Sequence, residues 1–302
     1  MQQAKIIDGR AMAADVKRQM AQRVAALDGR GRSVRLDAVL VGQDGGAALY
    51  ARNQGKMCRE VGIEHVLHEL SDGSSEDDIA DRVLRLNADP QVSAIMVHLP
   101  LPDGVDTERV QSLIAVEKDV EGVNPANIGN IVYGRRSLVP CTALAVMEMI
   151  ESTGVPLRGT CCVCVGASNI VGKPIVVLLM RCEATVISVN KYTPDLGEIT
   201  RSADVLISAT GVPGLIGSAM VKAGAVVIDV GISRVTTSQG QSRTVGDVAF
   251  DEVAQLAGYI SPVPGGVGPM TVAMLLRNTV DAAEQSARAY RVCHRRGSRA
   301  DT

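Results

Sequence analysis

Residues 261–271 read SPVPGGVGPMT, and this alternation of proline and glycine constrains the fold more than any other segment of the chain. Gly265, Gly266 and Gly268 carry no Cβ, so the backbone there can approach a flat ligand closely. The prolines restrict φ and prevent the segment from continuing as a strand or a helix. We therefore predict a stiff, ligand-facing loop directly before a long C-terminal helix. A tight strand-to-helix turn without a ligand is the alternative that this run leaves open when it is taken alone.

A second glycine turn lies at residues 166–174, which read GASNIVGKP. A β-type run at 161–165 precedes it, and the helical pattern IVVLLM follows it. Strand, glycine turn and helix in this order form a phosphate site, because the N–H groups of the first helical turn point at the anion. The spacing departs from G-x-G-x-x-G, since Ser168 stands at the second glycine position and Gly172 comes one residue late. An ordinary turn between strand and helix is therefore the alternative.

The composition narrows the class of protein. With 302 residues, of which 46% are hydrophobic, the chain is long enough for two domains with buried cores. It contains one Phe, five Tyr and no Trp, and its net charge is −2, so it lacks both stacking platforms and a basic field for nucleic acid. No apolar run approaches the ~20 residues that span a bilayer, and the N-terminus has no signal-peptide core. We expect a cytoplasmic protein that binds neither nucleic acid nor a membrane.

Seven cysteines, an odd number distributed through apolar runs, favour a reducing compartment over a disulfide framework. Cys161 and Cys164 form a C-x-x-C motif, but they lie in an expected strand, where their side chains face opposite sides of a sheet. The four histidines show no metal-site spacing. We therefore expect no metal and no redox role for the cysteine pair.

Strand and helix patterns alternate along almost the whole chain, which predicts an α/β protein with mainly parallel sheets. The expected strands are 35–41, 65–70, 94–99, 162–165, 185–189, 205–208 and 226–230. The expected helices are 11–27, 47–61, 75–86, 144–151 and 271–290. Helix 75–86 opens with the capping pattern Ser75-Glu-Asp-Asp78. Residues 140–142 and the helix after them are expected to form the hinge between two halves.

Taken together, GASNIVGKP, Asp229-Val-Gly-Ile232, Val245-Gly-Asp-Val248 and PVPGGVGPMT resemble the methylenetetrahydrofolate dehydrogenase/methenyltetrahydrofolate cyclohydrolase family, the bifunctional folate enzymes of one-carbon metabolism. The resemblance runs from KIIDGR at the N-terminus through the HLPLP and KDVEGVNP segments to the last helix, so it covers nearly the whole chain. It implies two α/β domains, the second a Rossmann-like doubly wound parallel sheet, with folate in the cleft between them. A homodimer is the usual assembly that it implies.

The resemblance also implies the domain boundaries. Residues 1–141, completed by the helix 271–290, are expected to form the folate-binding catalytic domain. Residues 142–270 are expected to form the NAD(P)-binding domain. Residues 291–302 are basic and rich in small residues, and this composition predicts a disordered tail.

The resemblance assigns roles to single residues as well. Those expected to bind the nicotinamide cofactor are Gly166, Ala167 and Ser168, which hold its phosphates, and Ile232, which packs near the nicotinamide. Those expected to line the folate site are Pro264, Gly265 and Gly266. Tyr50 is expected to stack against the pterin and aminobenzoyl part of a tetrahydrofolate-derived substrate, and a half-buried helix tyrosine is the alternative.

Three departures from the family pattern fall on the chemistry. The bifunctional enzymes carry a catalytic lysine four residues after the tyrosine, where this chain has Gln54. They carry glutamine before L-P-L-P, where this chain has His98, and aspartate in K-D-V-D-G, where this chain has Glu121. Glu121 keeps a carboxylate that can accept two hydrogen bonds from a pterin edge. Lys56 does not replace the missing amine, because positions 54 and 56 lie ~200° apart around a helix.

The two family reactions place different demands on these positions. Oxidising the methylene bridge removes hydride from a carbon whose two nitrogens stabilise the cation, so it needs geometry and no side-chain base. Opening the methenyl ring needs water to attack and lose a proton, which a desolvated lysine assists and an amide cannot. With Tyr50, Gln54, His98 and Glu121 as the catalytic residues, we expect a methylenetetrahydrofolate dehydrogenase with weak or absent cyclohydrolase activity.

His98 leaves alternatives open. An imidazole titrates near neutrality, so His98 with Gln54 would support ring opening in a protein that is still bifunctional. The simpler interpretation is a histidine that fills the glutamine site and forms structural hydrogen bonds. A non-catalytic folate- or nucleotide-binding regulator, and a reductase of another small substrate, are further alternatives.

The choice of cofactor depends on the segment after the second strand of the cofactor domain. NAD-preferring Rossmann sites place an acid ~20 residues after the first glycine. Residues 186–192 read VISVNKY and contain no acid, whereas Lys191 offers a positive charge to a 2′-phosphate. We therefore predict NADP, with NAD as the alternative.

Overall fold

The structure is a computed structural model that describes residues 3–42, 45–135, 137–236 and 240–297, with residues 288–297 described as backbone only. It divides into two compact units. Unit 1 comprises residues 1–14 and 140–274, and unit 2 comprises residues 15–139 and 275–302. These boundaries differ from the expected ones at the N-terminus. Residues 1–14 group with the second half of the chain because β1 (Lys5–Ile6) pairs in parallel with β11 (Tyr259–Ile260).

Unit 1 is built on a six-stranded sheet of order β1-β11-β8-β7-β5-β6, in which all pairs are parallel. Its remaining strands are β5 (Cys161–Val165), β6 (Thr185–Val189), β7 (Val205–Ser208) and β8 (Val226–Asp229). Its helices are α6 (Cys141–Glu151), α7 (Gly172–Arg181), α8 (Leu196–Arg201), α9 (Phe250–Val253) and the 3-10 helix η1 (Ser218–Met220). Because β6 and β7 lie on opposite sides of β5, the strand order reverses there. This confirms the predicted doubly wound parallel sheet.

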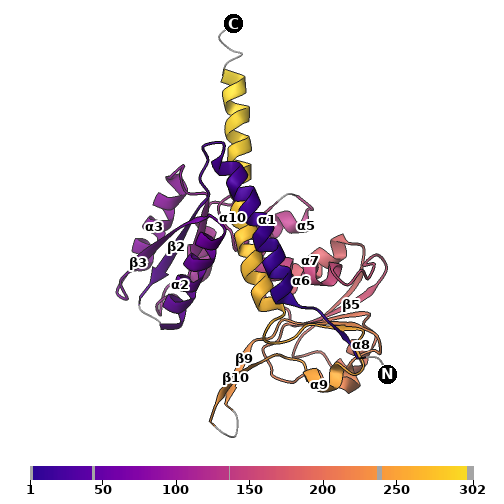
Figure 1. Cartoon of the computed structure of the whole chain (residues 1–302). Helices are drawn as coiled ribbons and strands as arrows, with labels where there is room; N and C mark the ends of the chain where they lie inside the picture. The colour runs from indigo at the N-terminus through magenta and orange to yellow at the C-terminus, as the bar shows by residue number, and fades with distance from the viewer. Residues whose placement is uncertain (1–2, 43–44, 136, 237–239, 298–302) are drawn as a thin grey trace. The chain divides into compact units, whose positions relative to one another are not determined.

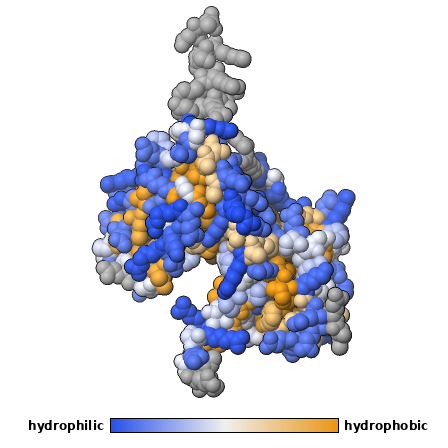
Figure 2. Space-filling model, in the orientation of Figure 1, coloured by the Kyte–Doolittle hydropathy of each residue, from blue (hydrophilic) through white to orange (hydrophobic). Residues whose placement is uncertain are grey.

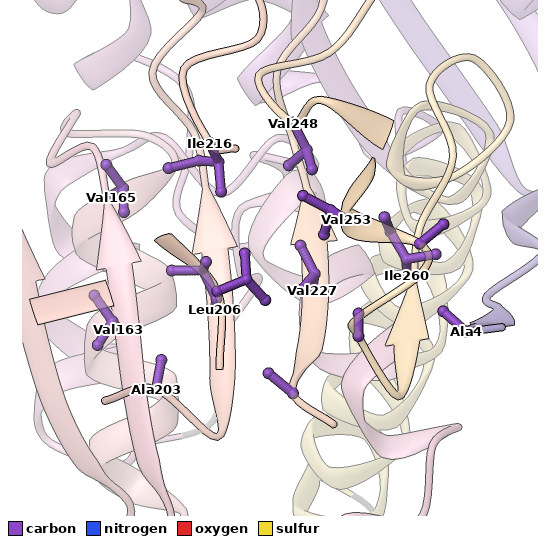
Figure 3. Packing of buried hydrophobic residues seen from close by; sticks show 14 of the residues in the cluster. Ala4, Val163, Val165, Ala203, Leu206, Ile216, Val227, Val248, Val253 and Ile260 are labelled. Carbon is purple, nitrogen blue, oxygen red and sulfur yellow. The ribbon is translucent and has the colours of Figure 1, made fainter. Parts of the chain in front are cut away.

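The strands of this six-stranded sheet are apolar along most of their length, as is typical of a parallel sheet with both faces covered. Figure 3 shows one buried cluster, in which Val163, Leu206, Val227 and Ile260 from four strands project to the same side. Strand register supports this alignment, since Val163 pairs with Leu206 and Leu206 with Val227. Burying each such aliphatic side chain stabilises the fold by about 1.5–3 kcal/mol.

Unit 2 holds a three-stranded parallel sheet of order β3-β2-β4. Its strands are β2 (Arg35–Val41), β3 (Glu64–Leu70) and β4 (Ala94–Val97), and its shorter helices are α2 (Gly45–Glu60), α3 (Glu76–Ala88), α4 (Thr107–Ser112) and α5 (Pro125–Val132). The predicted capping box is confirmed, because Ser75 and Asp78 each bond to the other's backbone N–H at the start of α3.

Helices α2 and α3 cover opposite faces of this sheet (Figure 1). Val39 and Val97 pack in one apolar cluster with residues of α3. Met96, next to Val97 on β4, instead contacts Gln54 of α2. Neighbouring residues of a strand point to opposite faces, so α2 and α3 are separated by the sheet.

Other elements depart from the predicted pattern. Helix α1 spans Gly9–Asp28, and α10 spans Val267–Gly297, so α10 includes residues 291–297 that were expected to be disordered. Residues 298–302 of that expected tail lie outside the described residues. The antiparallel pair β9 (Ser233–Thr236) and β10 (Ser242–Val245) was not predicted. Its short, polar strands lack the apolar alternation on which strand prediction depends.

The surface is mainly hydrophilic on the side that Figure 2 shows, with apolar residues in separate patches. Among the described residues, no helix combines the length and the apolar character that crossing a membrane requires. In the same part of the chain, no three His, Cys, Asp or Glu side chains come together as a metal site. The cysteines described there are free thiols: Cys58, Cys141, Cys161, Cys162, Cys164 and Cys182.

Candidate active site

The turn after β5 is lined by backbone. Gly166 has a φ of +108°, and a Cβ at this position would overlap the Ala209 carbonyl oxygen after β7. A Cβ at Gly172 would overlap the Gly166 carbonyl oxygen, so α7 begins directly against the turn. Gly172 therefore provides the close helix–strand packing of the third glycine in G-x-G-x-x-G, although it comes one residue late.

The first turn of α7 bonds back to its own loop, since the Lys173 N–H donates to the Ser168 carbonyl at 3.0 Å and the Ile175 N–H to the Val171 carbonyl at 3.1 Å. Ala167 is half-buried and Ser168 is exposed. The side chain of Val171, the N-cap residue, forms no hydrogen bond to the helix. The Ser168 hydroxyl accepts a hydrogen bond from the Gly172 N–H at 3.4 Å. This turn lies at the carboxyl ends of β5 and β7, where the strand order reverses, and ligands of doubly wound sheets bind there.

Lys191 lies at the carboxyl end of β6, the strand beside β5. The Asn190 side chain shapes this turn, because its Oδ1 accepts a hydrogen bond from the Tyr192 N–H at 3.0 Å. Lys191 Nζ lies 4.9 Å from the centre of the exposed Tyr192 ring. The ammonium group therefore stands at the sheet position from which Rossmann folds contact the cofactor ribose.

Ile232 and the proline–glycine loop line one small pocket of about 70 Å³. The pocket lies where β8 and β11 end and α10 begins, and its lining includes Asp229, Gly231, Ile232, Pro264, Gly265, Gly266 and Gly268. Ile232 is 64% exposed, and a Cβ at Gly268 would lie 3.8 Å from its Cδ1. A Cβ at Gly9 would overlap the Gly266 carbonyl oxygen. The close backbone approach predicted for this loop is therefore made in part to another segment of the protein, at Gly9, and not only to a ligand.

Two buried carboxylates without a predicted role, Asp229 and Asp247, organise the loops of unit 1. Asp229 accepts hydrogen bonds from the N–H groups of Gly231, Asp247 and Val248 at 2.9–3.0 Å. Burial raises the pKa of Asp229 to about 6 against the lowering effect of these N–H donors. Asp247 in turn accepts from the Ser208 hydroxyl and from the Thr210 N–H and hydroxyl. The signal in the sequence was an aspartate within two residues of a glycine in both motifs.

In unit 2, the predicted residues Tyr50 and His98 come together. Tyr50 lies in α2 and is 41% exposed. Its ring meets the His98 ring edge to face, with centroids 5.8 Å apart and an interplanar angle of 81°. Such a contact contributes about 0.5–1.5 kcal/mol beyond buried area and fixes the orientation of both rings.

Gln54 lies one turn after Tyr50 and is only 1% exposed. Its Nε2 donates a hydrogen bond to Met96 Sδ at 2.9 Å, while its Oε1 is buried without a hydrogen-bond partner among the described residues. A buried polar atom left without a partner costs about 1–3 kcal/mol, so this oxygen marks a place that a ligand or water can complete. Lys56 is exposed, as predicted, and lies on a different side of α2.

His98 is buried and electrically neutral near pH 7. It is 2% exposed, and its Nε2 has no hydrogen-bond partner within the described part of the chain. Burial, with a smaller contribution from nearby His65, lowers the pKa of His98 to about 4. An imidazole with this pKa is a weak base at neutral pH, so the structure favours a neutral hydrogen-bonding role.

Glu121 is the polar residue of KDVEGVNP that the fold leaves for a ligand. Lys118 Nζ donates to the carbonyl groups of residues 86, 87 and 89, where α3 ends. Asp119 accepts from the Asn124 N–H at 2.7 Å and from the Asn127 side chain at 2.9 Å. Across the described residues, no hydrogen bond or ion pair engages the half-buried Glu121 carboxyl group. Burial and the neighbouring Asp119 carboxyl raise the pKa of Glu121 to about 8.

The register of β4 relates Glu121 to His98. Asp119 pairs in parallel with Ile95, so both chains run in the same direction toward Glu121 and His98. These two residues therefore follow the carboxyl end of the sheet in unit 2, the edge at which α/β proteins bind ligands. A larger depression of about 560 Å³ between α2 and β3 contains none of the predicted site residues. The unpartnered polar atoms, and not this depression, define the candidate site.

The predicted residues thus form two groups. In unit 1, strand ends position Gly166, Ala167, Ser168, Lys191, Ile232, Pro264, Gly265 and Gly266. In unit 2, α2 and the end of the sheet position Tyr50, Gln54, His98 and Glu121. Met96, Asp229, Asp247 and Lys118 belong to the same sites and had no predicted role.

Comparison with known proteins gives one consistent result. Residues 7–121 match the family model described as tetrahydrofolate dehydrogenase/cyclohydrolase, catalytic domain. Residues 140–287 match the NAD(P)-binding domain of the same description. The chain is 46% identical over 282 residues to the bifunctional protein FolD of Moorella thermoacetica, covering 93% of this chain and 99% of that protein.

Solved structures agree with the sequence relatives. The bifunctional FolD methylenetetrahydrofolate dehydrogenase/cyclohydrolase of Campylobacter jejuni superposes with a TM-score of 0.90 and 38% identity, covering 93% of this chain and 99% of that one. The Trypanosoma brucei methylenetetrahydrofolate dehydrogenase-cyclohydrolase, complexed with NADP and an inhibitor, superposes with a TM-score of 0.89 and 38% identity. That match covers 95% of this chain and 100% of the other.

Gly166→Ala tests the cradle in unit 1. We expect the affinity for NADP, measured by fluorescence titration, to fall by at least about tenfold because the added methyl group displaces the Ala209 carbonyl and widens the turn. Gly159→Ala is the matched control, since Gly159 precedes β5 at the opposite edge of the sheet and has a φ of +74° but no atom within 4 Å of its added Cβ. Equal losses of affinity in the two variants would contradict the cradle, because they would reflect only the cost of a positive φ.

Proposed function

The chain belongs to the tetrahydrofolate dehydrogenase/cyclohydrolase family, and we propose that it is an NAD(P)-dependent methylenetetrahydrofolate dehydrogenase with weak or absent cyclohydrolase activity. Hydride passes from the methylene bridge of 5,10-methylenetetrahydrofolate to NAD(P)⁺, which yields 5,10-methenyltetrahydrofolate and NAD(P)H. The observation that carries the second half of the proposal is Gln54, a buried amide that cannot titrate. It stands where the family resemblance places a catalytic lysine.

The glycine turn of unit 1 fits a dinucleotide. The turn excludes any Cβ at Gly166 and Gly172, so backbone can approach a pyrophosphate at the start of α7. Lys191 offers an ammonium group to a 2′-phosphate, which supports NADP as the preferred cofactor. The NADP complex of the Trypanosoma brucei relative supports the same choice. When bound, the cofactor supplies the hydride acceptor.

An exposed aromatic ring and an unpaired carboxyl group in unit 2 suit a folate. The partly accessible Tyr50 ring offers a stacking surface for the flat pterin and aminobenzoyl groups. The Glu121 carboxyl group, left without a protein partner within the described residues, can accept two hydrogen bonds from the N–H edge of the pterin. Neither role requires proton transfer during oxidation of the bridge, because the two nitrogens that flank the carbon stabilise the resulting cation.

Neither Gln54 nor His98 offers ring opening a base of suitable pKa. Gln54 can position water but cannot take a proton from it. The lowered pKa of His98, about 4, argues against the bifunctional alternative in which this imidazole assists hydrolysis. The names of the relatives favour that alternative, so the activity of purified protein must decide between them.

We also propose that the protein is a cytoplasmic homodimer. The homodimer comes from the family resemblance. The cytoplasmic location is supported by the free thiols among the described cysteines, which suit a reducing compartment.

The central test follows both reactions in purified protein. With 5,10-methylenetetrahydrofolate and NADP⁺, we expect reduced cofactor to form and 5,10-methenyltetrahydrofolate to accumulate, because no general base opens its ring. The triple variant Gln54→Lys, His98→Gln, Glu121→Asp should accelerate enzyme-dependent methenyl decay by about 10² or more, the typical contribution of one general base.

Asn53→Lys is the control for the added amine. It places a lysine one residue earlier on an exposed position of α2 and should leave methenyl decay unchanged. Rapid methenyl decay with the unmodified protein would refute the loss of cyclohydrolase activity and leave the dehydrogenase in place. No cofactor reduction at all would favour the regulator.

The raised pKa of Glu121 predicts a pH dependence. This carboxyl is protonated at pH 7 and ionises near pH 8, and the ionised form is the better acceptor for pterin N–H groups. We therefore expect kcat/KM for the folate to rise as pH increases through about 8, and to stay flat there in Glu121→Gln. Glu117→Gln, at an exposed position of the same segment, should keep the rise.

The raised pKa of Glu121 also predicts how the free energy of unfolding changes with pH. A carboxyl whose pKa is higher in the folded than in the unfolded state stabilises the fold at low pH, and that contribution is lost as pH rises toward 8. The unfolding free energy of Glu121→Gln should therefore fall less between pH 5 and pH 8 than that of the unmodified protein. A profile identical in both proteins would contradict the shift.

Lys191→Ala tests the choice of cofactor. Removing the ammonium group should raise KM for NADP⁺ by about tenfold, the worth of one charge-assisted hydrogen bond, and leave KM for NAD⁺ unchanged. Arg181→Ala, which removes an exposed cation at the other end of α7, should change neither value. Parallel loss with both cofactors in Lys191→Ala would show that this side chain does not contact the 2′-phosphate.

A further inference from the structure

The contact between Gln54 and Met96 fixes the direction of an amide dipole. Gln54 Nε2 lies 2.9 Å from Met96 Sδ, and both side chains are buried, with 1% and 6% exposed. A thioether has lone pairs but no proton to donate. Only the NH₂ group of the amide can bond to it, so the carbonyl oxygen must point away from the sulfur.

The other end of the amide has no protein partner. Gln54 Oε1 is buried and unbonded, and so is His98 Nε2, the neighbour of the Tyr50 ring, within the described residues. Gln54 lies one turn after Tyr50 in α2, and the His98 ring, which follows β4, meets the Tyr50 ring that offers a stacking surface. Buried polar groups are nearly always bonded in folded proteins, so each of these atoms can take a ligand or a water as its partner.

From this arrangement we infer that Met96 is a positioning residue, whose sulfur holds Gln54 so that the amide oxygen faces the one-carbon unit of the folate. This inference rests on the proposed dehydrogenase function. Loss of hydride leaves the carbon and its two nitrogens with a positive charge that the substrate lacks. A carbonyl dipole with its negative end toward that carbon stabilises the transition state more than the ground state.

The same geometry gives the substitution of lysine by glutamine a second consequence. A protonated amine at this position would oppose the developing cation, whereas an aimed amide oxygen favours it. Replacing lysine by Gln54 thus removes the base for ring opening and at the same time adds a dipole that favours hydride loss. Met96 determines which end of the amide the substrate meets.

Met96→Leu is the direct test, because it removes the sulfur acceptor at nearly constant volume. We expect kcat of the dehydrogenase to fall by about threefold to tenfold, the worth of one hydrogen bond, with KM for the folate changed by less than about twofold. The split between kcat and KM distinguishes aiming from a general loss of packing, since a loosened site would also weaken folate binding. Calorimetric titration with 5,10-methylenetetrahydrofolate in the absence of cofactor measures that binding without turnover.

A double-mutant cycle establishes that Met96 acts through Gln54. In a Gln54→Leu background, Met96→Leu should cause no further decrease in kcat. Met20→Leu is the matched control. Met20 is a buried methionine of unit 2 whose sulfur accepts a hydrogen bond from Arg23 at 3.5 Å, and its replacement should leave kcat unchanged.

Nuclear magnetic resonance separates failure of this inference from failure of the proposed function. The side-chain NH₂ signals of Gln54, identified by their absence in Gln54→Leu, should shift in Met96→Leu and stay unchanged in Met20→Leu, whether or not the protein oxidises folate. Unshifted signals, or an equal loss of kcat from Met96→Leu in both backgrounds, would overturn the positioning role. An unmodified protein without dehydrogenase activity but with the expected NH₂ shift would overturn the proposed function and retain the contact.

Discussion

Backbone-to-backbone contact at the ends of strands is the constraint on which the ligand edge of unit 1 depends. Gly166 presses against the Ala209 carbonyl, Gly172 against Gly166, and Gly9 against Gly266. Each contact brings two chain segments closer than any side chain permits, and so draws loops from distant parts of the sequence to one edge. The carboxylates of Asp229 and Asp247 then hold the remaining loops through backbone N–H and hydroxyl donors.

Unit 2 is organised by polar atoms whose bonding is incomplete. The three positions that depart from the family pattern are all buried or half-buried, and each presents an unpartnered polar group within the described residues: Gln54 Oε1, His98 Nε2 and the Glu121 carboxyl. They are also consistent electrostatically. With a neutral amide and a neutral imidazole at this edge, burial and Asp119 determine the pKa of Glu121, and both raise it. Proton transfer needs a titratable base at this edge, whereas hydride transfer needs only groups that position the substrate.

The sequence was sufficient for most of the regular elements. Continuous apolar runs such as 205–208 predicted the buried parallel strands, because a strand that is covered on both faces is apolar at successive positions. The hairpin β9–β10 was missed because its strands are polar, and the place of β1 was missed because a pairing of two residues leaves no pattern. The roles of Met96 and Asp247 depend on contacts between segments far apart in the chain, namely residues 54 with 96 and 208–210 with 247. Such pairings have no signature in a single sequence.

Within the KDVEGVNP segment, Lys118 has a structural role that is separate from the ligand-facing position of Glu121. Its ammonium group binds three carbonyl oxygens at the end of α3, while Asp119 and Asn124 tie the same stretch to its neighbours. The support is thus complete without Glu121, which leaves that single position open to exchange. Enzyme redesign can therefore vary position 121 alone. A new acid, amide or alcohol there would be presented to a heterocycle by a backbone that the substitution leaves unchanged.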